Sequence, residues 1–208
     1  MAEGNERRYS GRSVQEWKDA RRERLLDAGL ALFGSEGYQG TSIERLCSTA
    51  KVSTRHFYQE FPNKEAVLLA VHEQGVQLGL GKALEALTTA EESIDVRLVD
   101  ALRAYLHTII TDPRRGRIAF VEVVGVSPAA ELRRREFREA IVAVIEEEGN
   151  AAVARGEMPP QDFRHLAIAL VGAVNGVIYD WMFEDPRPPA EELEAALSTL
   201  ALRIFGLA

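Results

Sequence analysis

The chain has 208 residues, of which 46% are hydrophobic and 27% charged, and its formal net charge is −7. This is the composition of an ordinary globular protein, and the negative charge excludes a polycation. A single cysteine, Cys47, excludes an intramolecular disulfide and is typical of a reducing cytosol. The polar N-terminus lacks the apolar core of a signal peptide, so we expect a cytoplasmic protein.

Charge is unevenly distributed along the chain. Residues 1–64 carry more Lys and Arg than Asp and Glu, and the acidic excess falls after residue 64. This asymmetry indicates a basic working end on an acidic body. A second basic run, ELRRREFRE at 131–139, contains interleaved glutamates and is interpreted as a solvated helix face.

The chain is predicted to be helical throughout, because no stretch shows the period-two alternation of a strand. Ser13 and Glu16 fit a capping box, and the helix that they open is expected to run to about Gly34. Apolar residues at helical spacing predict one buried stripe on this helix: Leu25, Ala28, Gly29, Leu32 and Phe33.

Two shorter helices are expected next. Thr41 and Glu44 fit a second capping box, whose helix turns Leu46 and Ala50 inward. Ser53 is the expected N-cap of a third helix.

Phe57 and Phe61 anchor the inner face of this third helix, and Pro62 ends it. Two short helices joined by a tight turn and packed on a longer helix form a helix-turn-helix unit. Residues 13–62 are therefore expected to be a DNA-binding domain.

Asn63 is the expected N-cap of a long fourth helix that runs toward residue 88. The chain is thus predicted to be all-α with about nine helices, and residues 63–208 are expected to form a separate helical domain. After the fourth helix, the next one is expected to begin at 90–93 and to end at Thr111, where 112–116 breaks the chain. A further helix then runs up to 125–128. The last three are expected at 129–155, at 161–183 and over EELEAALSTLALRIF.

The inward direction of the two phenylalanines leaves the polar side chains of the third helix facing outward. Residues at the start of such a helix reach base edges in the major groove, where Arg binds guanine bidentately. For 53–61 taken alone, a solvated surface turn is an equally good interpretation.

Residues 22–71 carry more specific motifs. LLDAGLALFGSEGYQGTS, TAKVSTRHFYQEF and PNKEAVL follow one another in register. This segment resembles the DNA-binding domain of the TetR (tetracycline repressor) family. The resemblance implies a bacterial transcriptional regulator, usually a repressor. It also implies a homodimer that binds double-stranded operator DNA and a C-terminal domain that holds a small-molecule effector.

The resemblance also implies roles for single residues. Phosphate contacts are implied for Thr41, Tyr58 and Lys64, and base-facing positions for Thr54, Arg55 and His56. The expected DNA-binding residues are Thr41, Ser53, Thr54, Arg55, His56, Tyr58 and Lys64.

Two positions depart from the family pattern. Lys51 stands where the turn usually has glycine, so we expect a left-handed lysine at a cost on the order of 1 kcal/mol. Arg55 stands where glycine is frequent, which leaves the operator sequence open. Residues 1–12 carry three arginines and are expected to form a flexible arm; an arm along DNA and a solvated tail both remain open.

The apolar segment at 161–183 is expected to be a fully buried helix and not a membrane span. Together with the last helix it is expected to form the dimer interface, as the resemblance implies. The interface residues are predicted to be Leu166, Leu170, Gly172, Ala173, Gly176, Val177, Leu193, Leu197 and Leu200.

A pocket for an apolar or aromatic effector is expected among the middle helices. Its walls are predicted to include Tyr105, Phe120 and Tyr179, with Asn175 as a polar anchor and His107 and His165 as further candidates. For each residue taken singly, packing in the core is the more ordinary role.

No catalytic motif, phosphate-binding glycine loop or metal-ligand spacing is present, so we expect neither an enzyme nor a cofactor or metal site. The preferred hypothesis is a ligand-responsive transcriptional repressor. Two alternatives stay open: a helical small-molecule-binding or enzymatic protein whose helix-turn-helix is only structural, and a sequence-independent architectural DNA protein.

Overall fold

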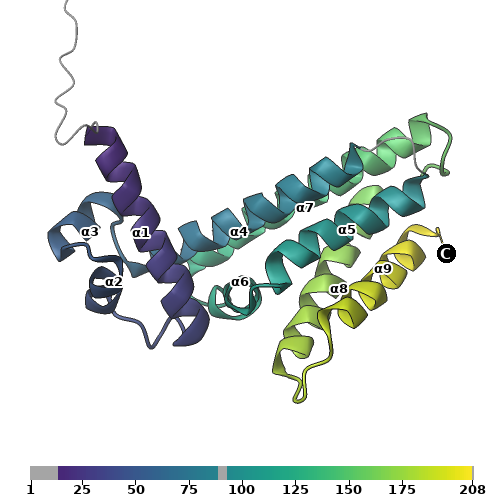
Figure 1. Ribbon diagram of the computed structural model, residues 1–208. Helices are drawn as coiled ribbons and strands as arrows, with labels where there is room; N and C mark the ends of the chain where they lie inside the picture. Colours follow the sequence, from purple (N-terminus) through teal and green to yellow (C-terminus); the bar gives the residue numbers. More distant parts are fainter. Residues whose placement is uncertain (1–13, 89–92, 208) are drawn as a thin grey trace, which may run out of the picture.

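The computed structural model describes residues 14–88 and 93–207 (Figure 1). In these ranges the chain is helical and contains no strand, as predicted. The expected arm at 1–12 and the capping residue Ser13 lie outside the described residues.

The N-terminal unit consists of three helices, α1 (Val14–Ser35), α2 (Ile43–Ala50) and α3 (Thr54–Glu60). The predicted apolar stripe of α1 is buried, with Leu25 and Phe33 fully enclosed. Burial of each large apolar side chain stabilises the fold by roughly 1.5–3 kcal/mol. This stripe is therefore the base on which α2 and α3 pack.

The remaining elements form the body of the molecule (Figure 1). They are α4 (Lys64–Leu87), α5 (Ile94–Ile110), α6 (Pro113–Arg117), the π-helical segment η1 (Ile118–Glu122), α7 (Pro128–Ala154), α8 (Phe163–Phe183) and α9 (Ala190–Phe205).

The expected break at 112–116 is in fact the start of a helix. Asp112 caps α6 through a hydrogen bond from the Arg114 backbone N–H to its side chain, and Pro113 occupies the first turn, where no N–H is needed. The chain then continues from α6 directly into the wider helical turn of η1, without a loop between them. Such π-helical turns are frequent at functional sites.

Two hydrophobic clusters hold the molecule together. The first joins α1, α2, α3 and the start of α4, and it also includes Ile118 and Val123 from the η1 region. The second joins α5, α7, α8 and α9. Packing of the first cluster thus crosses the expected boundary at residue 62, and the division into domains stays a prediction.

Helix α8 is not buried on all sides, which corrects the expectation for 161–183. Leu170, Val174 and Ile178 belong to the second cluster, whereas Ile168 and Val177 are 40% and 39% exposed. By length and composition α8 is apolar enough to cross a membrane, but a core helix of a soluble protein passes the same test. The exposed face of α8 is therefore a surface that remains for a partner.

Candidate nucleic-acid interface and internal cavity

The turn between α2 and α3 has the predicted left-handed residue. Lys51 ends α2 with φ 53° and ψ 46°, and its N–H bonds the carbonyls of Cys47 and Ser48. Val52 is buried behind it. Arg24 of α1 donates from Nε to the Ala50 carbonyl at 3.1 Å, which satisfies a further carbonyl at this helix end.

Ser53 fixes the start of α3, as predicted. Its Oγ accepts from the His56 backbone N–H at 3.3 Å and lies 3.0 Å from His56 Nδ1. Thr54, Arg55 and His56 are exposed on this first turn. The cap therefore holds three polar side chains outward beside the positive end of the helix dipole.

The inner face of α3 is apolar, also as predicted. Phe57 is fully buried and Phe61 nearly so, and their rings lie 6.3 Å apart. Tyr58 is 56% exposed and meets the Phe57 ring edge-on at 5.3 Å. Packing thus orients Tyr58 while its hydroxyl stays free to bind a phosphate.

The expectation for Thr41 needs correction. Its side chain is 2% exposed, and Oγ1 donates to the Gly37 carbonyl at 2.8 Å. Ser42 is the N-cap of α2, since its side chain accepts from the Arg45 backbone N–H. A buried and hydrogen-bonded hydroxyl offers no contact to a phosphate.

Lys64 is tied to its own chain. Its Nζ donates to the carbonyls of Tyr38 and Thr41 at 2.7 and 2.8 Å and lies 4.1 Å from the centroid of the Tyr38 ring. Burial lowers the pKa of this ammonium group. Lys64 therefore links the start of α4 to the loop before α2.

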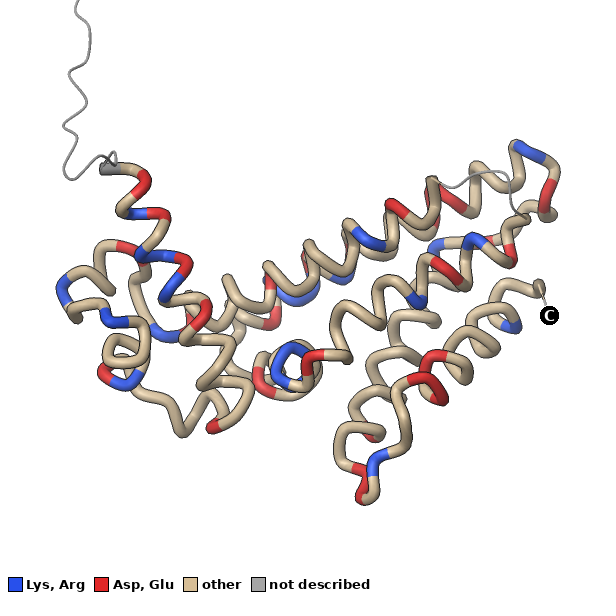
Figure 2. Tube along the Cα trace, viewed as in Figure 1, with Lys and Arg blue, Asp and Glu red and all other residues tan. Residues whose placement is uncertain are grey.

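Basic residues mark the α2–α3 end of the molecule, opposite the C-terminus (Figure 2). Arg55 and Lys51 are exposed there, and Arg45 pairs with Glu36 at 3.0 Å. Arg21 is bound to Glu60 at 2.9 Å. Lys51 and Arg55 thus place positive charge on the turn and on the first turn of α3.

A cavity of about 370 Å³ lies in the body, between α4, α5, η1, α7 and α8. This volume is within the usual range of small-molecule sites. Tyr105, Phe120 and Asn175 line it, so three of the four predicted residues come together. Tyr179 lines a shallow recess beside the cavity, and its ring packs against that of Phe183 in a tilted arrangement with 5.0 Å between the centroids.

Two further candidates lie elsewhere, because His107 and His165 have side chains that are 69% and 80% exposed. The histidine that lines the cavity is His72 of α4, which sequence reasoning missed. The sequence pattern that indicates its burial is the helical spacing it shares with Val76, Gly79 and Ala83, which form the buried stripe of α4.

Arginines at the cavity were also missed. Arg134, Arg135 and Arg138 of α7 line it, although their run was interpreted as a solvated face. Their spacing places them on adjoining parts of one helix surface. Arg134 pairs with Glu131 at 2.8 Å.

Two titratable groups in the cavity are perturbed. Burial, with the nearby charge of Arg134 as a second cause, lowers the pKa of His72 from 6.5 to about 4, so its imidazole is neutral at pH 7. Burial raises the pKa of Tyr105 to about 12. Tyr105 lies directly on Gly79, where an added Cβ would come within 3.0 Å of its ring.

The segment η1 connects the cavity to the helix-turn-helix. Phe120 lines the cavity, and Ile118 belongs to the first hydrophobic cluster. Glu122 accepts from the Tyr38 backbone N–H at 2.7 Å and from Arg117 Nε at 2.8 Å. A continuous set of contacts therefore joins the segment that carries Phe120 to the loop before α2.

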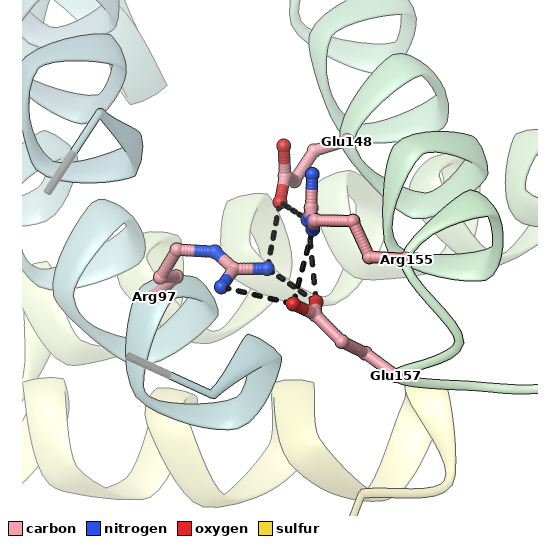
Figure 3. Close-up of polar contacts among 4 residues, drawn as sticks. All are labelled: Arg97, Glu148, Arg155 and Glu157. Atoms are coloured by element: carbon pink, nitrogen blue, oxygen red, sulfur yellow. Dashed lines mark hydrogen bonds and ion pairs between the residues drawn. The ribbon is translucent and has the colours of Figure 1, made fainter. Parts of the chain in front are cut away.

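An ion-pair network of four residues surrounds Glu148, which lines the cavity (Figure 3). Arg97, only 2% exposed, pairs with Glu148 of α7 and with Glu157 of the following loop. Arg155 binds the same two carboxylates at 2.6 and 3.0 Å. Hydrogen bonds from Arg97 and Arg155 lower the pKa of Glu157 to about 2.

Several predicted interface residues are in fact core residues. Leu170, Leu193 and Leu197 are 3%, 5% and 1% exposed within their own chain, so they are not available to a partner. Leu166 and Leu200 pack partly against the second cluster. The predicted residues that do face outward are Gly172, Gly176 and Val177, with Ala173 partly covered.

Residues 14–88 and 93–207 contain no group of three or more His, Cys, Asp or Glu side chains that could hold a metal ion. The chemistry of the cavity is that of apolar walls, three arginines, two glutamates, a histidine, a tyrosine and an amide.

Comparisons with known proteins agree with this arrangement. Residues 25–71 match the family of bacterial regulatory proteins, tetR family, and residues 91–205 match a tetracyclin repressor-like C-terminal domain. The HTH-type transcriptional regulator HbdR of Aromatoleum sp. (strain CIB) is 26% identical over 190 residues, which are 88% of this chain and 80% of HbdR.

Two solved structures have the same fold. FadR from Bacillus subtilis, in complex with stearoyl-CoA, has a TM-score of 0.78 at 14% identity, covering 89% of this chain and 98% of FadR. AibR, in complex with isovaleryl coenzyme A and operator DNA, has a TM-score of 0.66 at 20% identity, covering 89% and 98%. The second family match alone spans more than half of the sequence. The chain therefore belongs to the tetR family of bacterial regulatory proteins.

Proposed function

We propose that the protein is a ligand-responsive transcriptional repressor of the bacterial cytoplasm. It binds an operator as a homodimer and leaves it when a small, largely apolar molecule occupies the cavity. The observation that carries this proposal is the continuity of α4. Val67 and Leu68 belong to the core of the helix-turn-helix, whereas Val76 and Ala83, further along α4, line the cavity.

DNA is read by the first turn of α3. Thr54, Arg55 and His56 supply donors and acceptors for base edges, and Tyr58 and the α3 N-terminus bind phosphates. The support is that these side chains are exposed while Phe57 of the same helix is buried. Ser53 acts here as a cap that orients His56.

The dimer uses the exposed face of α8. Gly172 and Gly176 have no atoms within 4 Å of an added Cβ, and they allow the backbone of a partner helix to approach closely. Val177 and Ile168 supply exposed apolar surface beside them. An isologous interface of this kind places the two α3 helices on the same side of the dimer.

Release follows from the spacing of the two α3 helices, which must lie roughly 34 Å apart to enter successive major grooves. An effector that displaces α4, or η1 through Phe120, changes this spacing, because α4 and the η1 region are packed against the helix-turn-helix. DNA and effector then oppose each other by the same free energy, whichever binds first.

The nature of the effector has independent support. FadR and AibR, which share this fold, were solved with acyl-coenzyme A thioesters, and AibR also with operator DNA. Most of the cavity lining of this chain is aliphatic or aromatic, as an acyl group requires.

An electrophoretic mobility shift on the chain's own upstream DNA tests the proposal. The shift is expected to survive scrambled competitor DNA and to be reversed by decanoyl-CoA or another apolar ligand. Equal competition by scrambled DNA would favour an architectural protein. Absence of any shift at low salt would sink the proposal and favour a ligand-binding protein whose helix-turn-helix is only structural.

A further inference from the structure

The polarity of the cavity changes along its length. His72 stands near the beginning of α4, and Ala83 and Leu87 stand toward its end. At 1.5 Å per residue, Ala83 lies roughly 16 Å from His72 along the helix. The polar groups at the His72 end and the apolar groups at the far end are therefore separate subsites.

The far subsite is apolar. It is lined by Ala83, Leu87, Ile94, Leu98, Ile145 and Met158. The carboxylate at this end, Glu148, is engaged by Arg97 and Arg155 and leaves no free charge for a ligand.

The near subsite is cationic. Helix α7 runs parallel to α4 here. Ser127 Oγ donates to Glu65 Oε1 at 2.7 Å, and further along both helices the ring centroids of Phe137 and His72 lie 5.3 Å apart. It brings three arginines to the cavity against one glutamate, Glu131. Arg135 and Arg138 are exposed and have no ion-pair contact within 4 Å in the described ranges; Glu139 interacts with both through its charge at longer range, and Glu131 with Arg138.

His72 is the second, independent observation. It is 8% exposed, and its Nδ1 is the one buried side-chain nitrogen or oxygen in the described ranges that has no hydrogen-bond partner. An unpaired buried polar group costs about 1–3 kcal/mol. An unpaired buried group of this kind calls for an explanation, and a rotation of the ring toward a ligand in the cavity would supply the partner.

We infer that the effector is an amphiphile with an anionic head, bound in one orientation. Its apolar part fills the far subsite, its polar junction hydrogen-bonds His72, and its negative charge lies against Arg135 and Arg138. This inference rests on the proposed function and adds the head-group chemistry and direction of the ligand. The head thus lies at the end of the cavity next to the helix-turn-helix.

Two kinds of molecule share this chemistry. In a free carboxylic acid, the charged group itself lies against Arg135 and Arg138, beside His72. In a coenzyme A thioester, the carbonyl meets His72 and the phosphates meet the exposed Arg135 and Arg138. Four matched probes separate them: decanoate, decanoyl-CoA, decanol and coenzyme A alone.

Calorimetric titration of the full chain with these probes tests the inference. Decanoate or decanoyl-CoA is expected to bind at least tenfold more tightly than decanol and coenzyme A. Arg135→Ala with Arg138→Ala should remove this preference and leave decanol unchanged, whereas Arg103→Ala, an exposed arginine outside the cavity, should preserve it. If the double variant loses affinity for decanoate, the ligand is the free acid. If it loses affinity for decanoyl-CoA alone, the ligand is the thioester.

His72 is tested by a pair of variants. His72→Leu should weaken the anionic probe about tenfold, and His72→Gln, which keeps hydrogen-bonding groups, should restore most of the affinity. Both variants are checked for unaltered folding by urea unfolding.

Equal binding of decanol and the anionic probes, binding of none of the four, or a preference that survives the double arginine variant would overturn the inference. Operator binding in the mobility shift is measured separately, so failure of the head-group inference is distinguishable from failure of the repressor proposal.

Discussion

The ammonium group of Lys64, the first residue of α4, donates to the backbone carbonyl of Thr41 at 2.8 Å. The same group bonds the carbonyl of Tyr38, whose own N–H is held by Glu122 of η1. The loop before α2 is therefore fastened from two sides, by α4 and by η1. Both elements also line the cavity, so an effector has two routes to this loop.

Lys64→Met is expected to loosen this loop, because the two carbonyls lose a charged donor while the apolar stem of the side chain is retained. Operator and scrambled DNA should both bind more weakly. Where the charge lies near a phosphate, its removal also lowers the slope of log affinity against log salt concentration by about one. Binding titrations at several salt concentrations measure this. Lys82→Met is the matched control, since Lys82 lies on the same helix and pairs with Glu85. Unchanged affinity for both DNAs would contradict the prediction.

Arg55→Ala is expected to relax specificity at one base pair at a cost of about 1–3 kcal/mol, because a bidentate contact to guanine is lost. Selection from a randomised operator, followed by competition titrations, measures this. Arg45→Ala removes another exposed cation of the helix-turn-helix and should weaken all sequences alike. A uniform effect of Arg55→Ala would mean that this arginine reads no base.

The helix-turn-helix could be predicted closely from the sequence because its determinants are local. The cap at Ser53, the burial of Phe57 and the left-handed Lys51 each depend on a few neighbouring residues. The direction of Thr41 could not be predicted, since a shift of the cap by one residue, to Ser42, turns its hydroxyl from the surface to the Gly37 carbonyl.

The body was harder for a physical reason. Apolar residues cover more than one face of α8, so periodicity cannot decide which face meets the chain's own core. Tertiary packing places Leu170 inside and Val177 outside. The cavity likewise depends on contacts between distant segments. The burial and lowered pKa of His72 arise only when the fold brings Phe137 and Arg134 beside it.

Val177→Asp is expected to dissociate the proposed dimer. A carboxylate without a partner in an apolar interface costs several kcal/mol, so the dimer Kd should rise by at least about a hundredfold. Light scattering across a dilution series measures the mass. Leu132→Asp places the same charge on an exposed leucine of α7 and should leave the mass unchanged. A monomeric wild-type chain at micromolar concentration would refute the dimer itself.

Arg97→Met is expected to destabilise the fold by about 3 kcal/mol, because it leaves two carboxylates of the ion-pair network with one arginine fewer. Urea unfolding at pH 7 measures the loss. Arg103→Met, an exposed change on the same helix, should stay within about 0.5 kcal/mol of wild type. A loss of similar size in both variants would show that helix α5, and not the network, is sensitive to substitution.

The neutral state of His72 predicts a pH-dependent stability. Its pKa falls from 6.5 to about 4 on folding, so between these values the unfolded chain binds a proton that the folded chain does not. Stability from this group is fully present above pH 6.5 and is lost as the pH falls toward 4, by about 3 kcal/mol in total. His72→Gln and His72→Leu cannot bind this proton in either state, so their free energy of unfolding should fall less steeply than that of wild type over this range. Urea unfolding at pH 7, 6 and 5 measures the difference, and parallel curves for the three proteins would contradict a buried neutral imidazole.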